Sequence, residues 1–279
     1  MILLYSLIIS SLISTGLWVY YIEYLGNGIL FYTIPIVFIL SFLALILLLV
    51  IFLAICLLFR PVDENKVAPT KFYSFFTTQV ALLVSVIFGV RIKIENLDLI
   101  PKGEKFLFIS NHQAMFDPIA IIGYLRKYNI SYIMKDGIMK IPFVGRWLHA
   151  AGFLPIDRNN DRNALKTIIT ASKRLKNGYP ISVFPEGTRS GSYEVRPFKN
   201  GIFKIAEKAE SAIVVAYVDN FYNVKKRFPF KTTKCLLRIC RLIPYEEIKG
   251  LSTNEVGDMC RDIIIENQKE ARSKYSWIN

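Results

Sequence analysis

Apolar and polar residues are distributed very unevenly along the chain. Residues 2–22 form a run of 21 uncharged, mostly apolar side chains, and residues 29–59 form a second, longer run. A helix rises about 1.5 Å per residue, so about 20 residues span the ~30 Å hydrocarbon core of a bilayer. Both runs therefore predict membrane-crossing helices. Residues 23–28 (EYLGNG) hold two glycines and an asparagine, typical of a turn, and predict that the two helices form a hairpin.

A third apolar stretch, residues 72–90, differs from the first two. It contains Ser, Thr and Gln and is flanked by Lys71 and Arg91. We expect a helix that lies in, or dips into, the membrane interface. The alternative is a third crossing, which would place the rest of the chain on the opposite side. The first run has neither a basic start nor a small-residue cleavage site before Glu23, so a retained membrane segment is expected rather than a signal peptide.

From Arg91 onward the pattern changes to short apolar runs that alternate with amphipathic segments, which predict strands and helices respectively. Asp161 and Ser252 are the expected N-caps of two helices, and Pro155 marks its strand as an edge strand. The alternation predicts an α/β domain in which helices flank a mixed sheet. The expected strands are 91–94, 105–110, 131–134, 152–156, 180–184, 212–218 and 234–242, and the expected helices are 118–128, 162–176, 201–209 and 253–274.

Charge separates the same two parts of the chain. Glu23 is the one charged residue among residues 1–59, so the remaining 35 basic and 21 acidic residues give residues 60–279 a net charge of +14. A strongly basic domain binds either nucleic acid or an anionic membrane surface. The apolar start favours the membrane, and the sequence has no nucleic-acid-binding motif. We therefore expect membrane lipids as partners and no nucleic acid.

The placement of basic residues predicts the orientation. Arg60, Lys66 and Lys71 follow the second apolar run, whereas the short turn has no basic residue. The positive-inside rule then predicts an integral membrane protein with its globular domain on the cytosolic face. The expected parts are a transmembrane hairpin at 1–61, an interfacial or re-entrant helix at 62–92 and a cytosolic α/β domain at 93–279. For residues 225–231 (KKRFPFK) two interpretations stay open, contact with anionic headgroups and a solvated loop.

Candidate chemistry begins in the segment 110–118 (SNHQAMFDP), which follows an expected strand and opens an expected helix. His112 and Asp117 are five residues apart, so on a continuous helix they would point about 140° apart. They can meet only where the chain bends, as it does at a strand-to-helix turn. Asp117 would then accept a hydrogen bond from one ring nitrogen of His112, and the other nitrogen would take a proton from a hydroxyl group.

Two further clusters follow expected strands. The segment 183–190 (VFPEGTRS) ends a strand in a Pro-Glu-Gly turn and then presents Thr188, Arg189 and Ser190. A guanidinium beside hydroxyls and turn amides suits a phosphate monoester. The segment 152–158 (GFLPIDR) places Arg158 just beyond another strand. By themselves, a surface turn and a surface Asp157–Arg158 pair would explain these two clusters without any function.

These blocks, in this order, resemble the 1-acyl-sn-glycerol-3-phosphate acyltransferase family of the glycerolipid acyltransferase superfamily. Its N-H-x4-D block is matched by Asn111, His112 and Asp117. Its glycine-to-arginine block is matched by residues 152–158, and its F-P-E-G-T-R-S block by residues 184–190. The linking segments 135–145 (KDGIMKIPFVG) and 198–201 (FKNG) are also similar to the family. The resemblance covers about residues 90–220. One position departs: Val215 stands where the family's fourth block usually has proline.

The resemblance implies an acyltransferase. It would move a fatty acyl chain from acyl-CoA or acyl carrier protein to the free sn-2 hydroxyl of 1-acyl-glycerol-3-phosphate, by direct attack on the thioester. His112 would be the general base and Asp117 would orient it. Lys135, Arg158 and Arg189 would bind the acceptor phosphate. The remaining residues of the matched blocks would bind the acceptor or position the loop: Asn111, Glu186, Gly187, Thr188 and Ser190.

Three other functions remain as alternatives. The first is acylation of another lysophospholipid or of glycerol-3-phosphate. The second is a catalytically silent lipid-binding membrane protein, which a broken His–Asp pair would favour. A serine or cysteine hydrolase is disfavoured because the chain has no G-x-S-x-G segment. The four cysteines have no C-x-x-C spacing, so neither a metal nor a cofactor beyond the thioester co-substrate is expected.

Overall fold

The computed structural model describes residues 2–26, 33–58, 70–157 and 160–278. The chain divides into two compact units, residues 1–62 and residues 63–279. The first unit holds α1 (Ile2–Tyr24) and α2 (Thr33–Leu58), which pack against each other. Both helices are long and apolar enough to cross a membrane. This confirms the two apolar helices predicted from the sequence, while residues 27–28 of the predicted turn and residues 29–32 and 59 of the second run lie outside the described residues.

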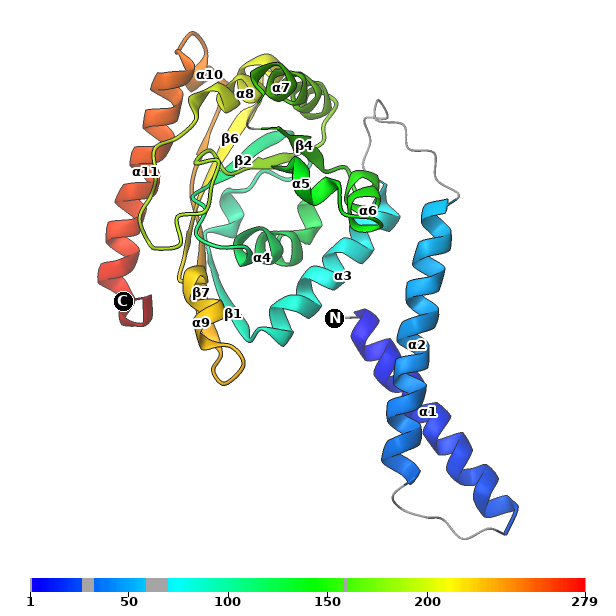
Figure 1. Ribbon diagram of the computed structural model, residues 1–279. Helices are drawn as coiled ribbons and strands as arrows, with labels where there is room; N and C mark the ends of the chain where they lie inside the picture. The colour runs from blue at the N-terminus through cyan, green and yellow to red at the C-terminus, as the bar shows by residue number, and fades with distance from the viewer. Residues whose placement is uncertain (1, 27–32, 59–69, 158–159, 279) are drawn as a thin grey trace. The chain divides into compact units, whose positions relative to one another are not determined.

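The second unit opens with α3 (Lys71–Ile87) and continues as alternating strands and helices (Figure 1). The strands are β1 (Val90–Glu95), β2 (Phe106–Ser110), β3 (Ser131–Lys135), β4 (Leu154–Ile156), β5 (Ile181–Val183), β6 (Ala212–Asp219) and β7 (Thr233–Ile243). The helices are α4 (Phe116–Tyr124), α5 (Asp136–Met139), α6 (Val144–Ala150), α7 (Asp161–Lys176), α8 (Lys204–Ala209), α9 (Val224–Arg227), α10 (Tyr245–Ile248) and α11 (Thr253–Lys274).

The seven strands of the described residues form one mixed sheet in the order β1-β7-β6-β2-β5-β3-β4. Five neighbours, β6, β2, β5, β3 and β4, run parallel, and β7 runs antiparallel to β6. The predicted mixed sheet flanked by helices is thereby confirmed. Strand β4 is at the edge of the sheet, as predicted from Pro155, because a proline has no N–H to donate to a second neighbouring strand. At Val215, the position of the expected proline, β6 stays a strand, but its pairing with β7 shifts register between Val215 and Ala216.

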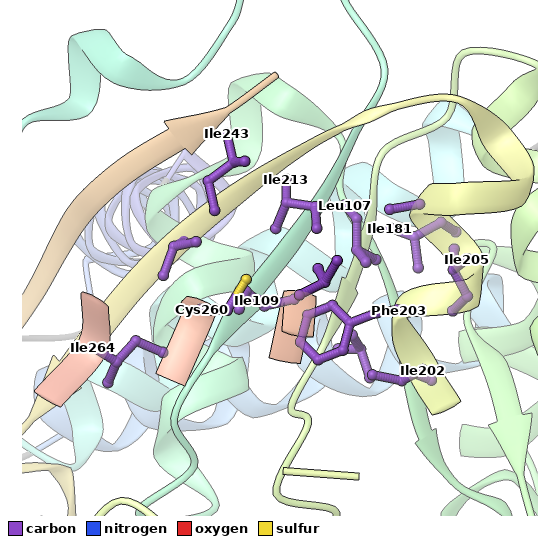
Figure 2. Close-up of a cluster of buried hydrophobic side chains, with 14 of the residues drawn as sticks. Leu107, Ile109, Ile181, Ile202, Phe203, Ile205, Ile213, Ile243, Cys260 and Ile264 are labelled. Atoms are coloured by element: carbon purple, nitrogen blue, oxygen red, sulfur yellow. The ribbon is translucent and has the colours of Figure 1, made fainter. Parts of the chain in front are cut away.

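Helices cover both faces of the sheet. Helices α7, α8 and α11 pack on one face, and α3 and α4 pack on the other (Figure 1). Alternate strand residues point to the first face because side chains in a strand have a period of two. These side chains form a buried hydrophobic cluster (Figure 2). In it, apolar residues of α8, α11 and the 3₁₀ turn before α8 meet the strand residues Leu107, Ile109, Ile181 and Ile213. This core holds the strand ends rigidly, and the strand ends carry the site.

Local signals explain several boundaries. The α11 N-terminus is a capping box, in which the Ser252 hydroxyl accepts from the Glu255 N–H and the Glu255 carboxylate accepts from the Ser252 N–H. The prediction that Asp161 caps α7 was wrong. The cap is Asn160, whose side chain accepts from the Asn163 N–H at 3.1 Å, and Asp161 is the first helical residue. Asn at that position satisfies the same orphan amide as Asp would.

Candidate functional site

The predicted site residues lie at one edge of the sheet. Strands β2, β5, β3 and β4 are adjacent and parallel, so their carboxyl ends meet at the same edge. His112 follows β2, Glu186 and Arg189 follow β5, and Lys135 ends β3. Arg158 comes two residues after β4 but lies outside the described residues. The sheet thus gathers segments that are up to 77 residues apart in the chain, from His112 to Arg189.

At the centre of this edge, Nδ1 of His112 is 2.8 Å from Oδ2 of Asp117. The chain bends sharply between β2 and α4, and this bend brings together two side chains that a continuous helix would hold apart. Asp117 is fully buried in the first turn of α4, whereas the His112 side chain keeps 12% of its surface exposed. Within the described residues no hydrogen-bond partner occupies Nε2 of His112. The ring nitrogen without a partner is therefore the one able to accept a proton.

Three N–H groups converge on the same oxygen of Asp117. Besides His112, the backbone N–H groups of Gln113 and Ala114 donate to Oδ2, at 2.5 and 2.9 Å. Burial raises the pKa of the Asp117 carboxyl, and the hydrogen bonds from His112 and the two amides oppose that rise. An oxygen that accepts three N–H donors is a carboxylate oxygen, so the His112 nitrogen facing it carries the hydrogen. In that tautomer Nε2 has no hydrogen and can accept one.

The ring of His112 is held by its neighbours. It stacks on Phe184 with ring centroids 4.1 Å apart and planes 18° apart. The backbone N–H of His112 donates to Oε1 of Glu186 at 3.0 Å, and its carbonyl accepts from the N–H of Ser190 at 2.8 Å. The segment after β5 therefore holds both the ring and the backbone of His112. Of the two roles expected for Glu186, this contact is compatible with loop positioning.

Glu186 is buried, and one of its two carboxyl oxygens makes no hydrogen bond to the described residues. Its Oε2 has no hydrogen-bond partner within the described residues, and the side chain is 4% exposed. Burial raises the pKa of Glu186 to about 7, although the His112 N–H lowers it in part. The carboxyl group is thus poised to change its charge near neutral pH.

The turn after Glu186 requires its glycine. Gly187 has φ +72°, and a Cβ there would approach the Lys199 side chain at 3.1 Å. Thr188 and Arg189 are exposed and follow directly. Arg196 spans this turn, donating to Oγ1 of Thr188 at 3.2 Å and to the Ser190 carbonyl at 3.4 Å. Arg196 lies outside the matched blocks, and sequence reasoning missed it.

The other expected residues divide between anchoring and exposed positions. Asn111 is fully buried and exchanges two 2.9 Å hydrogen bonds with the backbone of Val218, which ties the start of the site to β6. The Ser190 hydroxyl donates to the Ser192 carbonyl at 2.8 Å, inside its own loop. Lys135 is exposed at the end of β3, as Arg189 is after β5. These two exposed cations lie on the same side of the His–Asp pair along the strand-end edge, since β5 and β3 follow β2 in the sheet order.

The turn that begins the second block is held by a buried arginine. Gly152 has φ +92°, and its carbonyl accepts from Nη1 of Arg174, a residue of α7 that is 1% exposed. Burial lowers the pKa of the Arg174 guanidinium. No sequence pattern connects Gly152 with Arg174, 22 positions later, although Arg174 falls on the buried face of α7.

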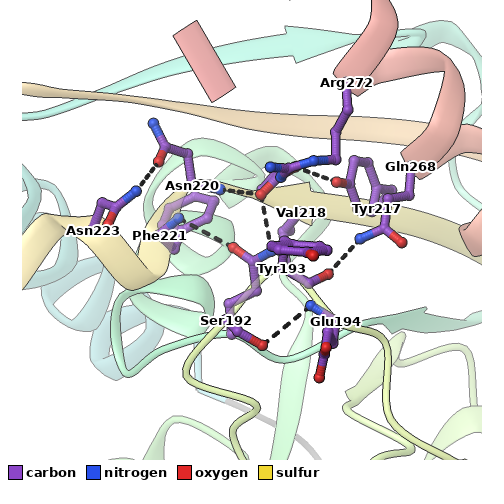
Figure 3. Close-up of polar contacts among 12 residues, drawn as sticks. Ser192, Tyr193, Glu194, Tyr217, Val218, Asn220, Phe221, Asn223, Gln268 and Arg272 are labelled. Carbon is purple, nitrogen blue, oxygen red and sulfur yellow. Dashed lines mark hydrogen bonds and ion pairs between the residues drawn. The ribbon is translucent and has the colours of Figure 1, made fainter. Parts of the chain in front are cut away.

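A polar network continues from the site to the C-terminal helix (Figure 3). The side chain of Gln113 donates to Oδ1 of Asp219 at 3.0 Å and accepts from the Phe221 N–H at 3.2 Å. Asp219 ends β6, is fully buried, and pairs through Oδ2 with Arg272 of α11 at 3.0 Å. Gln113 thus contacts Asp117 through its backbone and Asp219 through its side chain.

The same helix also contacts the loop that follows the third block. The Arg272 guanidinium lies 4.3 Å from the ring centre of Tyr193. The side chain of Gln268 donates to the Tyr193 carbonyl, and Arg261 donates to the carbonyls of Val195 and Arg196. The loop after β5 therefore contacts His112 at Ser190 and α11 at residues 193–196. Within the described residues no group of three His, Cys, Asp or Glu side chains is placed to bind a metal ion.

Comparison with known proteins shows which family the chain resembles. Residues 91–219 match the acyltransferase family model. The 1-acyl-sn-glycerol-3-phosphate acyltransferase of Borreliella burgdorferi is 27% identical over 195 residues, which cover 69% of this chain and 78% of that protein. The enzyme of the same name from Helicobacter pylori is 30% identical over 155 residues, which cover 55% of this chain and 65% of that protein, less than two thirds of its length.

A solved structure shows the same fold. The crystal structure of the 1-acyl-sn-glycerophosphate acyltransferase of Thermotoga maritima matches 96% of this chain with a TM-score of 0.65 and 22% sequence identity. The strand-end site lies within the matched segment 91–219, and the predicted resemblance is confirmed. Residues 91–219 of this chain are therefore similar to the acyltransferase family in sequence, and the chain has the fold of a solved acyltransferase.

Proposed function

We propose that this protein transfers a fatty acyl chain from a thioester to the sn-2 hydroxyl of 1-acyl-glycerol-3-phosphate, giving phosphatidic acid. The names of the relatives from Borreliella burgdorferi and Helicobacter pylori support this acceptor. The single observation that carries the proposal is the His112–Asp117 pair, with Nδ1 of the ring 2.8 Å from a buried carboxylate and the ring partly exposed.

The proposed reaction is a direct transfer with no acyl-enzyme. Nε2 of His112 takes the proton of the acceptor hydroxyl while that oxygen attacks the thioester carbonyl carbon. The tetrahedral intermediate collapses, the carbon–sulfur bond breaks, and the proton on His112 passes to the leaving thiolate. Asp117 stabilises the imidazolium that forms between these steps because its charge lies against Nδ1.

The phosphate of the acceptor would be bound at the same edge. Lys135 and Arg189 are exposed cations at the ends of β3 and β5, and Arg158 follows β4. Neighbouring strands are about 4.8 Å apart, so the end of β3 lies about 10 Å from the end of β2. The long side chains of Lys135 and Arg189 would have to reach back from these strand ends toward the phosphate of an acceptor whose hydroxyl is held by His112. A planar arginine fork suits the phosphate oxygens.

The membrane helices fit a lipid acceptor. Acceptor and product are both lipids, and α1 and α2 are long and apolar enough to cross a bilayer. Basic residues follow α2 and are absent from the turn before it, which supports a catalytic domain on the cytosolic face. We further propose that acyl-CoA or acyl carrier protein delivers the acyl chain from that side.

A substrate panel tests the proposal. The full-length protein, purified in detergent, is mixed with 1-oleoyl-glycerol-3-phosphate and oleoyl-CoA, and thiol release and phosphatidic acid are followed together. Stoichiometric formation of both supports the assignment. The same assay with glycerol-3-phosphate, lysophosphatidylcholine and lysophosphatidylethanolamine identifies any other acceptor, and acyl carrier protein is tested as the second donor. Thiol release without lipid product would indicate a thioesterase, and no turnover with any acceptor and donor would contradict the proposal.

A further inference from the structure

The segment between β6 and β7 carries exposed phenylalanines beside a cluster of cations. Phe230 is 91% exposed and Phe228 is 39% exposed. The cations Lys225, Lys226, Arg227 and Lys231 surround them, and all four are exposed. No acidic residue occurs between Asp219 and Glu246 in the sequence. The exposed phenylalanine rings are unfavourable in water, and the positive charge around them attracts anions. Together they complement an anionic, partly apolar partner.

This apolar area continues onto the end of α3. The ring of Phe228 lies 4.5 Å from that of Phe88, the residue that follows α3. Val86 and Ile87, in the last turn of α3, are 50% and 55% exposed. The Thr233 N–H donates to the Gly89 carbonyl at 2.9 Å, which holds the two segments together. We call Val86, Ile87, Phe228 and Phe230 the Phe228 patch.

The Phe228 patch borders the catalytic loop. Phe88 also contacts the ring of Phe116 at 4.9 Å, and Phe116 is adjacent to Asp117. Met115, which is 51% exposed, lies in the same loop. Figure 1 shows α9 and the beginning of β1 at the same end of the domain. A surface bound to the patch would therefore come close to the entrance of the His–Asp site.

We propose that the Phe228 patch and its four cations dock this domain onto the surface of an anionic lipid bilayer. The phenylalanine and aliphatic side chains would lie at the boundary between headgroups and acyl chains, and the cations would lie among lipid phosphates. Val86 and Ile87 favour lipid over nucleic acid because aliphatic side chains neither stack on bases nor form hydrogen bonds. The docking requires no particular acceptor or donor, so it goes beyond the proposed reaction and can be tested without measuring it.

The test places an environment-sensitive dye at the tip of the segment. The full-length protein carries Cys56→Ala and Cys240→Ala, which remove the two partly exposed cysteines, together with Phe230→Cys labelled with a nitrobenzoxadiazole dye. It is reconstituted into nanodiscs of equal parts phosphatidylcholine and phosphatidylglycerol. The expected result is a blue-shifted dye emission that is quenched by doxyl-labelled lipid. The same dye at Glu246→Cys is the control, because residue 246 is exposed at the other end of β7, an 11-residue strand about 35 Å long.

A second set of variants tests whether the cations contribute to docking. The docked and undocked patch form a two-state equilibrium. Lys225→Gln should lower the docked-to-undocked ratio about fivefold, because it removes the attraction of one cation to the anionic surface. Lys226→Gln should lower the ratio by the same factor for the same reason. Pure phosphatidylcholine should reduce the blue shift in the same direction. An emission at residue 230 as solvent-like as at residue 246 would overturn the proposal. A blue shift that RNA oligonucleotides produce and lipid does not would overturn the choice of lipid.

Discussion

The backbone N–H of His112 donates to Oε1 of Glu186 at 3.0 Å, so the proposed general base is held by a side chain that follows a different strand. The two residues are 74 positions apart in the chain and meet because β2 and β5 are neighbours in the sheet. The contact has a consequence for stability, since it buries a carboxyl group whose second oxygen has no partner among the described residues.

Glu186 should make the protein less stable as the pH rises. Burial raises its pKa from 4.5 to about 7, so between these values the folded protein keeps a proton that the unfolded chain has released. Stability therefore falls from about pH 4.5 to about pH 7, by roughly 3 kcal/mol in total. Glu186→Gln is neutral at every pH and should lose this dependence. Thermal unfolding in detergent at about pH 5 and about pH 8 measures it, and equal pH dependence in both proteins would contradict the burial argument.

Gln113 should act as a positioning residue. Gln113→Leu keeps the side-chain volume but removes the bond to Asp219 and leaves the Phe221 N–H without its acceptor. We expect a stability loss of about 3 kcal/mol. We also expect kcat to fall about tenfold while KM for the acceptor stays unchanged, because the loop that holds His112 loosens. Gln79→Leu is the matched control, a buried glutamine of α3 whose loss should lower stability without lowering kcat in the folded protein.

If the two Gln113 effects separate, the assignment changes. A variant with the expected stability loss but a normal kcat would show that Gln113 has only a structural role. A higher KM with unchanged kcat would instead place its side chain on the acceptor.

Arg272 and Asp219 should be energetically coupled. Asp219 is fully buried, and Arg272→Met would leave its charge without a cationic partner, at a cost of about 3 kcal/mol. Adding Asp219→Asn to that variant should restore part of the loss, giving a coupling energy of about 1–3 kcal/mol in a double-mutant cycle. Chemical denaturation in detergent measures it. The exposed pair Arg241–Glu247 is the control and should couple by less than about 1 kcal/mol; equal coupling in both pairs would contradict the argument from burial.

Arg189 should discriminate acceptors by their phosphate. Arg189→Ala removes an exposed guanidinium at the strand-end edge and should raise KM for 1-oleoyl-glycerol-3-phosphate about 10- to 100-fold, the range for a hydrogen bond to a charged group. Turnover of monoacylglycerol, which has no phosphate, should not change. Arg126→Ala serves as the control, since Arg126 is exposed just before the amino end of β3. A similar KM change for both acceptors in Arg189→Ala would exclude phosphate recognition by Arg189.

The sequence predicted the parts of the fold whose signals are local. The strands of the sheet are short apolar runs with turn residues at their ends, and each of the seven expected runs is a strand in the structure. Helices α5 and α6 were missed because they have four and seven residues, too few for a helical period to be visible. The linking segment requires a glycine at position 145, because a Cβ there would lie 1.7 Å from the Met139 carbonyl oxygen.

The site was predictable where its residues are neighbours in the sequence and hidden where they are not. His112 and Asp117 form a readable pair because only a bend can join them, and the structure has that bend. Asp219 and Arg272 gave no signal. Their role depends on the parallel register that sets β6 beside β2 and on the packing of α11 against β6. Contacts of this kind follow from topology, which the pattern of single residues does not specify.

The most direct test of the account compares its two histidines. The chain has His112 in the strand-end site and His149 in α6, and each is replaced by alanine in the full-length protein. With 1-oleoyl-glycerol-3-phosphate and oleoyl-CoA, His112→Ala should reduce kcat by at least ~100-fold, the typical contribution of a positioned general base, while its thermal stability stays close to that of the wild type. His149→Ala should retain most of the activity. Equal turnover by His112→Ala and the wild type would contradict the assignment of His112 as the base.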